Sequence, residues 1–119
     1  MTDYHEPPQE LSSETRDLVR ALNSLREEIE AIDWYQQRVD VSDNESLRSV
    51  LAHNRDEEIE HACMTLEWLR RNMDGWDEHL RQILFSEEEI TDLEPEKEGG
   101  SEEATIVFSG SRDLGIGKI

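Results

Sequence analysis

A helical stripe that is apolar at both ends and polar in its middle is the feature that most constrains this chain. Between residues 47 and 68 its members recur at spacings of four and three, the periodicity of one face of an α-helix. We call this stripe the seam; its residues are Leu47, Leu51, Asn54, Glu58, His61, Thr65 and Trp68. A carboxylate in such a face is costly unless it is paired, protonated or bound to a metal, so Glu58 needs a partner. His61 lies three residues later on the same face and is the obvious candidate.

A second set of helical stripes lies earlier in the chain. Leucine and isoleucine residues recur at spacings of four and three from residue 18 to residue 32, and an adjoining stripe runs from residue 21 to residue 39. Glu28 and Tyr35 both belong to the adjoining stripe, so a carboxylate interrupts this face too. These patterns predict an all-α fold in which two long helices form an antiparallel hairpin.

Capping residues predict where the two helices begin. Ser12 or Ser13 suits the N-cap of the first helix, because a serine hydroxyl can accept a hydrogen bond from a free amide of the first turn. Residues 40–44 have the composition of a short loop. Ser42, followed three residues later by Glu45, fits a capping box at the start of the second helix.

Composition divides the chain into four segments. Residues 1–11 contain adjacent prolines and no periodicity, so we expect a flexible N-terminal arm. Residues 12–94 form the helical domain, in which Gly75 ends the second long helix and the amphipathic stretch after it predicts a short third helix. Residues 95–110 are expected to be a flexible linker, because they begin with a run rich in charge and glycine, and residues 111–119 form an apolar tail.

The charge balance narrows the classes of partner. With 30 acidic and 12 basic residues, the chain is not expected to bind nucleic acid or an anionic membrane surface, whereas cations suit it. No apolar run approaches the ~18 residues needed to span a bilayer. The first residues also lack a secretory pattern, so we expect a cytoplasmic protein. Cys63, the single cysteine, cannot form an internal disulfide and is interpreted as a packed thiol.

The size of the helical domain predicts self-association. A hairpin of two helices buries too little apolar area to be comfortably stable alone. The stripes left over on both helices supply a surface for a second copy. A symmetric dimer of hairpins would form a four-helix bundle, so we expect a homo-oligomer built from dimers.

Glu58 and His61 form a Glu-x-x-His pair, whose side chains can bind one cation together. Carboxylate-bridged di-iron sites in helical bundles take a Glu from each of two helices and a Glu-x-x-His pair from each of the other two. Two hairpins related by a two-fold axis would supply Glu28, Glu58 and His61 twice. This ligand set suits Fe(II) or Mn(II) better than a structural zinc ion.

Other interpretations of these residues remain open at this point. Glu57, Glu58 and Glu60 with Arg55 could form a solvated face of ion pairs. The Glu-x-x-His pair could merely fix the register of a noncatalytic helical scaffold, or could serve a manganese-dependent redox protein. We expect no comparable carboxylate geometry at His5, His53 and His79 and assign them no role.

Three stretches of the sequence resemble the encapsulated ferritins, which are two-helix ferritin-like proteins carried inside encapsulin shells. The stretches are EEIEAIDWYQQRVD, LAHNRDEEIEHACMTLEWLRRN and the terminal DLGIGKI, and the resemblance covers residues 12–94 and the last nine residues. It implies a ferroxidase that oxidises Fe(II) to Fe(III) with dioxygen at a di-iron site formed across a dimer interface. It also implies delivery of the iron for mineral storage inside an encapsulin nanocompartment.

The resemblance carries expectations for individual residues. These are Glu28, Glu58 and His61 as ligands of the ferroxidase centre, Tyr35 beside it, and Glu27, Glu30 and Trp34 lining an outer metal site. The three ligands are the residues that spacing also indicates. The resemblance further implies an annular decamer of five dimers.

The tail is expected to be an encapsulin-targeting peptide that binds the shell protein through Leu114, Ile116 and Ile119. Leu114 and Ile116 are two residues apart, so their side chains face the same way in an extended peptide and suit a shallow apolar groove. The linker of residues 95–110 can extend about 50 Å, which is enough to tether the folded domain to the inner wall of a shell.

Overall fold

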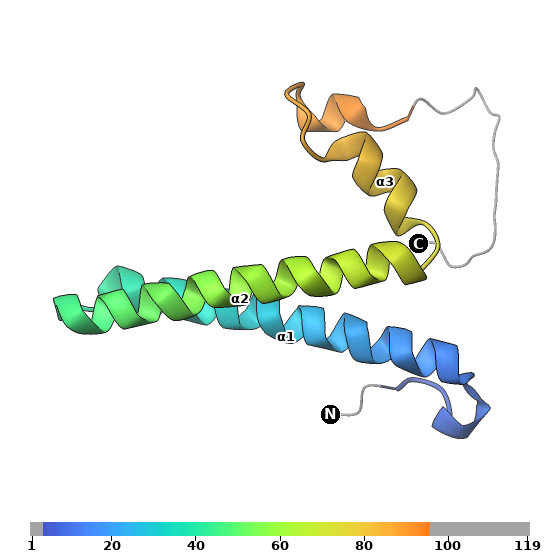
Figure 1. Ribbon diagram of the computed structural model, residues 1–119, viewed down its shortest axis with the longest axis horizontal. Coiled ribbons are helices and arrows are strands. Elements are labelled where there is room, and N and C mark those ends of the chain that lie inside the picture. Colours follow the sequence, from blue (N-terminus) through green and yellow to red (C-terminus); the bar gives the residue numbers. More distant parts are fainter. Residues whose placement is uncertain (1–3, 96–119) are drawn as a thin grey trace. The chain divides into compact units, whose positions relative to one another are not determined.

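The computed structural model describes residues 4–95, and the regular structure in that range is entirely helical (Figure 1). The elements in chain order are the 3-10 turn η1 (Pro8–Glu10), the helices α1 (Ser13–Val41), α2 (Glu45–Asn72) and α3 (Trp76–Ile83), and the 3-10 turn η2 (Ile90–Leu93). The prediction of an all-α chain with two long helices and a short third one is confirmed. The predictions for the linker beyond Pro95 and for the tail of residues 111–119 concern residues outside the described range.

The start of α1 agrees with the predicted cap. Ser12 is the N-cap residue, and its hydroxyl accepts a hydrogen bond from the backbone amide of Thr15 at 3.0 Å. Arg16, one turn into the helix, donates from Nε to the carbonyl oxygen of Pro8 at 3.1 Å. The turn η1 is thereby tied to the first turns of α1.

The prediction for the cap of α2 was wrong. The N-cap residue is Asn44, whose side-chain oxygen accepts from the backbone amide of Leu47 at 2.9 Å. Ser42 instead closes α1, because its own backbone amide donates to the carbonyl oxygen of Arg38 at 3.1 Å. Its hydroxyl accepts from the amide of Asn44 at 3.3 Å and so stabilises the loop. Asparagine caps as well as serine does, and only Asn44 directly precedes the first helical residue.

The two long helices run side by side in opposite directions (Figure 1). Side-chain hydrogen bonds between the described residues join α1 to α2. They include Arg48 Nε to the carbonyl oxygen of Val39 at 3.1 Å, Arg55 Nη1 to Gln36 Oε1 at 2.8 Å, and Thr65 Oγ1 to Glu28 Oε2 at 3.3 Å. The later a donor lies in α2, the earlier its acceptor lies in α1. This is the order that an antiparallel hairpin requires. The predicted hairpin is therefore confirmed, and these bonds fix its register.

The hairpin has almost no interior of its own. Leu69 is the single buried residue within the described range. Large apolar side chains remain exposed along both helices, and they include Ile29, Trp34, Val41, Leu47, Val50, Ile59, Met64 and Trp68. Cys63 is exposed as well, so its interpretation as a packed thiol was wrong: one helix can cover only one side of α2, and Cys63 lies off that side.

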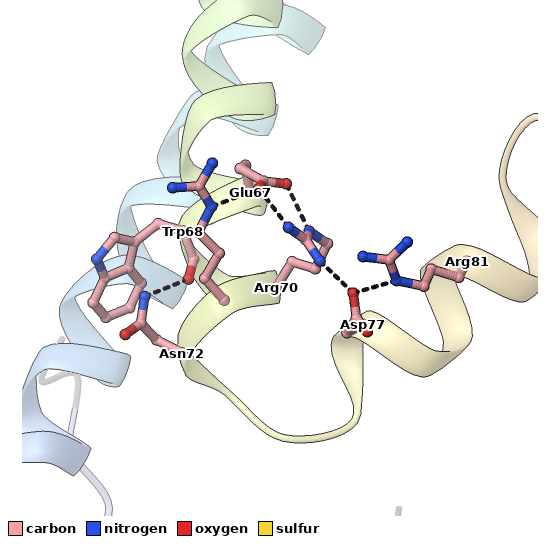
Figure 2. A network of polar contacts seen from close by, with 7 residues as sticks. Glu67, Trp68, Arg70, Asn72, Asp77 and Arg81 are labelled. Atoms are coloured by element: carbon pink, nitrogen blue, oxygen red, sulfur yellow. Dashed lines mark hydrogen bonds and ion pairs between the residues drawn. The ribbon is translucent and has the colours of Figure 1, made fainter.

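A network of charged side chains connects the end of α2 to α3 (Figure 2). Arg70 holds both oxygens of Glu67, from Nε and Nη2, at 2.8 Å each, and Arg71 Nε reaches Glu67 Oε2 at 2.7 Å. Through Nη1, Arg70 also donates to the Asp77 carboxylate, which accepts from Arg81 Nε at 2.8 Å. One guanidinium thus links the last turns of α2 to the first turn of α3.

The ionisation of this network follows from its hydrogen bonds. Donation from Arg70 and then Arg71 lowers the pKa of Glu67 to about 2, and donation from Arg70 lowers the pKa of Asp77. The same bonds to Glu67 and Asp77 raise the pKa of Arg70. The network is therefore fully charged at neutral pH.

Gly75 makes the turn between α2 and α3. Its φ is +102°, and a β-carbon there would meet nothing within 4 Å, so the backbone conformation rather than the available space calls for glycine.

None of the helices within residues 4–95 combines the length and apolar composition that crossing a bilayer requires.

The chain divides into two compact units after Arg81, and the described part of the second unit is a short segment that ends in η2. Gln82 Nε2 donates to the carbonyl oxygen of Leu93 at 2.7 Å, which closes this segment into a loop. Phe85 adopts a φ of +62° just after α3, a left-handed conformation that commonly terminates a helix.

Replacing Arg70 should release α3 from α2. We expect Arg70→Ala to lower the hydrogen-exchange protection of the α3 amides several-fold, because both of its carboxylate partners lose their shared donor. Arg20→Ala is the matched control, since Arg20 pairs with Asp17 on the surface of α1 alone. Equal loss of α3 protection in both variants would contradict the role of Arg70.

The pH dependence of the same protection has a defined sign. Both carboxylates have lowered pKa values, so their stabilising contribution is complete above their ordinary values and disappears as pH falls through the folded values, about 2 for Glu67. Protection factors of α3 in the unsubstituted protein should therefore be similar at pH 7 and pH 5 and fall toward pH 2.

Candidate metal centre

The Glu58 and His61 side chains lie together on α2, as the spacing predicts. His61 Nδ1 is 3.5 Å from Glu58 Oε1, and both side chains are partly covered, with 45% and 28% of their surface exposed. One carboxylate and one imidazole are therefore presented side by side from adjacent turns. This pair could supply one oxygen and one nitrogen ligand to a cation, and its assignment as part of a metal site stays a prediction.

Glu28 lies on α1 and points across the hairpin toward α2. Its Oε2 accepts the hydrogen bond from Thr65 Oγ1 at 3.3 Å, while its Oε1 is buried without a hydrogen-bond partner among the described residues. A buried acceptor that stays unpaired is destabilising and is uncommon in folded proteins. A cation next to Oε1 would supply the missing partner, so this carboxylate fits a metal site.

One copy of the chain does not assemble the complete site. No group of three or more His, Cys, Asp or Glu residues within residues 4–95 is arranged to hold a metal ion. Glu28 contacts Thr65, which lies one helical turn beyond His61. The structure therefore brings together Glu58 and His61 and leaves Glu28 separate from them.

The remaining predicted residues all lie on α1. Tyr35 is half-buried, and the guanidinium carbon of Arg38 lies 5.4 Å from its ring centroid, in the range of a cation–π contact. Glu27 and Glu30 are exposed, and Trp34 keeps 49% of its surface accessible. An outer metal site at these three residues, and a place for Tyr35 beside the centre, stay predictions.

Sequence reasoning missed two contacts. The first is the contact of Thr65 with Glu28, because the sequence placed Thr65 in the seam without giving it a role. The signal that could have indicated a role is a hydroxyl one helical turn from His61. His53 does have a carboxylate neighbour, because its Nε2 lies 3.9 Å from Glu57 Oε2, but these side chains are 71% and 50% exposed. The His53–Glu57 pair is thus a solvent-exposed counterpart of the His61–Glu58 pair on the same helix.

Comparison with known proteins agrees with this fold. A family model described as EncFtn-like matches residues 3–87, which include α1, α2 and α3. A "Ferritin-like protein" of Thermotoga maritima is 58% identical over 116 residues, covering 98% of this chain and 96% of that protein. An "Encapsulated ferritin-like protein" of Rhodospirillum rubrum is 51% identical over 120 residues, covering 97% and 86%.

A third relative and a solved structure extend the comparison. The "Encapsulin nanocompartment cargo protein EncC" of Myxococcus xanthus is 36% identical over 56 residues, which cover 46% of this chain and 43% of that protein. The crystal structure of protein ne0167 from Nitrosomonas europaea superimposes with a TM-score of 0.73 at 54% identity, covering 75% of this chain and 99% of that one.

The helical hairpin and these relatives place the chain in a ferritin-like class of protein. The chain belongs to the EncFtn-like family, because the family model spans most of its length and relatives more than half identical cover nearly all of it.

Removing the unpaired Glu28 oxygen should stabilise the metal-free protein. We expect Glu28→Met to raise the free energy of unfolding by about 1 kcal/mol, because a buried acceptor without a partner is replaced by a side chain of similar length that needs none. Thermal or denaturant unfolding in chelator at fixed protein concentration measures this change. Glu27→Met, at the exposed neighbouring position, should leave stability within experimental scatter; a lower stability of the Glu28 variant would contradict the interpretation.

Proposed function

We propose that this protein is a ferroxidase, which oxidises Fe(II) to Fe(III) with dioxygen at a di-iron site formed between two copies of the chain. The observation that carries the proposal is the buried, unpaired oxygen of Glu28 on the same hairpin as the Glu58 and His61 pair. Membership of the EncFtn-like family supports it. Iron is the substrate here, and the ligands come from the chain.

The ligand set suits this substrate. Two copies related by a two-fold axis contribute Glu28, Glu58 and His61 twice, which gives four carboxylates and two imidazoles for two ions. Hard carboxylate oxygens with one nitrogen ligand each favour iron over the softer metals. The four negative charges balance those of two divalent ions. Two adjacent Fe(II) ions supply two electrons, which together with two protons reduce one dioxygen molecule to the level of hydrogen peroxide.

The exposed apolar surface also supports a second copy. The hairpin buries one residue within the described range and leaves Leu47, Val50, Met64 and Trp68 exposed on α2. Covering these side chains with a second hairpin would complete a four-helix bundle and remove them from water. The same packing would bring two half-sites together. In this proposal five such dimers form an annular decamer.

We further propose that the protein is an encapsulin cargo that resides in the lumen of the shell, in the cytoplasm. The names of the Rhodospirillum rubrum and Myxococcus xanthus relatives support this assignment. The shell protein would bind Leu114, Ile116 and Ile119, which lie outside the described residues. Oxidised iron would then be stored as mineral inside the shell, while exposed acidic side chains such as Glu27 and Glu30 attract Fe(II) to the decamer.

Iron oxidation tests the proposal directly. Addition of Fe(II) in air should be followed by Fe(III) formation faster than in buffer, and substitution of Glu58→Gln or His61→Ala should reduce the rate to that of buffer. The single variants His53→Ala and Glu57→Gln are matched controls, because each removes one member of the exposed carboxylate–imidazole pair on the same helix. These controls should oxidise iron at the unsubstituted rate.

The same assay separates the alternatives. A noncatalytic scaffold would give the buffer rate in every variant. A manganese-dependent enzyme would consume oxygen with Mn(II) and not with Fe(II). Either result would overturn the ferroxidase proposal.

Metal should also strengthen the dimer. If each hairpin holds only half of the ligands, metal ions bind the dimer and not the single chain. The dissociation constant of the dimer should therefore fall at least tenfold at saturating metal. Analytical ultracentrifugation with and without Zn(II), a redox-inert probe, measures this shift. It should vanish in His61→Ala and persist in His53→Ala. If the dissociation constant of the dimer is the same with and without Zn(II), the site does not span two copies.

A further inference from the structure

We propose that Thr65 is a positioning residue of the metal centre: its hydroxyl holds one oxygen of Glu28 so that the other stays available to the cation. The inference deepens the proposed function and rests on the site described there. It assigns a role to a seam residue that supplies no ligand itself.

The geometry divides the two oxygens of Glu28 between two tasks. Oε2 accepts from Thr65 Oγ1 at 3.3 Å, whereas Oε1 is buried and has no hydrogen-bond partner among the described residues. Glu28 belongs to α1 and Thr65 to α2, so the bond also ties the carboxylate to the helix that carries the other ligands. Thr65 follows His61 by four residues, which places the tether on the same face of α2, one turn away.

A threonine hydroxyl suits this task better than a charged donor. An arginine or lysine at the position would neutralise the carboxylate and compete with the metal ion. A hydroxyl has a single proton to donate and leaves the negative charge in place. Threonine is also restricted in χ1, so its hydroxyl loses less freedom when it is directed at one acceptor.

In a helix, a threonine hydroxyl commonly donates to the backbone carbonyl four residues earlier. In α2 that carbonyl belongs to His61, and the Thr65 hydroxyl donates instead to Glu28. The contact across the hairpin has therefore replaced the local one.

The surroundings of Thr65 dictate how it should be substituted. Thr65 is part of the wall of an open cleft of about 390 Å³ between α1 and α2, lined also by Asp17, Arg20, Ala21, Ser24, Met64 and Trp68. A smaller side chain would enlarge this cleft and confuse loss of the hydroxyl with loss of volume. Thr65→Val keeps the shape and removes the donor, whereas Thr65→Ser keeps the donor and removes a methyl group.

The experiment measures Co(II) binding to the full-length protein by its visible absorption, without any turnover. Hydrogen-bond partners of metal ligands typically contribute 10- to 100-fold in affinity. We expect Thr65→Val to weaken Co(II) binding by at least about tenfold and Thr65→Ser to bind within about threefold of the unsubstituted protein. If the valine variant does not fold, Thr65→Ala takes its place, and its combination with Glu28→Gln then separates the two losses, because an effect of lost volume would persist in that double variant.

A double variant shows whether Thr65 positions Glu28, binds the metal directly or only packs against its neighbours. Because Thr65 acts through Glu28, Thr65→Val should have no further effect on Co(II) affinity when combined with Glu28→Gln. An equal loss in the Glu28→Gln background, or unchanged affinity in Thr65→Val, would overturn the inference while leaving the proposed ferroxidase intact. Failure of the unsubstituted protein to bind Co(II) at all would instead overturn the proposed site, and the role of Thr65 with it.

Discussion

A carboxylate oxygen buried without a hydrogen-bond partner is the constraint on which the rest of this structure depends. The Glu28 side chain accepts one neutral hydrogen bond from Thr65, and its second oxygen is buried without a partner among residues 4–95. Such a group lowers the stability of the isolated chain. A cation would pair with this oxygen and remove that cost.

A single copy of the chain also leaves apolar surface uncovered. Of the apolar side chains that helical spacing predicts for a core, Ile29, Leu47 and Trp68 remain exposed in one copy and many others are only half-buried. The His61–Glu58 pair is also partly exposed. The exposed apolar area is the surface that a second hairpin would cover in the proposed dimer. The charged junction at Arg70 is satisfied within the chain and needs no such partner.

The sequence predicted what depends on a single helix and missed what depends on register. Glu58 and His61 meet because residues three apart share a helical face, and no knowledge of the hairpin is needed. The bond between Thr65 and Glu28 requires knowing which turn of α1 faces which turn of α2, and periodicity leaves that free by a turn in either direction. The junction of Arg70 with Asp77 similarly depends on the direction in which the chain leaves Gly75. The caps show the same limit on a smaller scale, because Ser42 and Asn44 are both good caps and only the exact end of α1 decides between them.

The near absence of buried residues changes where the fold is vulnerable. In a typical small domain, an apolar-to-polar substitution is rejected because it disrupts an interior. Here Leu69 is the single described position at which that argument applies within one molecule. Several other apolar residues of α1 and α2, such as Leu22 and Ile32, are half-buried in the single chain. In the proposed dimer, substitutions at the exposed apolar positions would act on contacts between copies, so their effect on stability would depend on protein concentration. On that proposal, the exposed positions are constrained as an interface is.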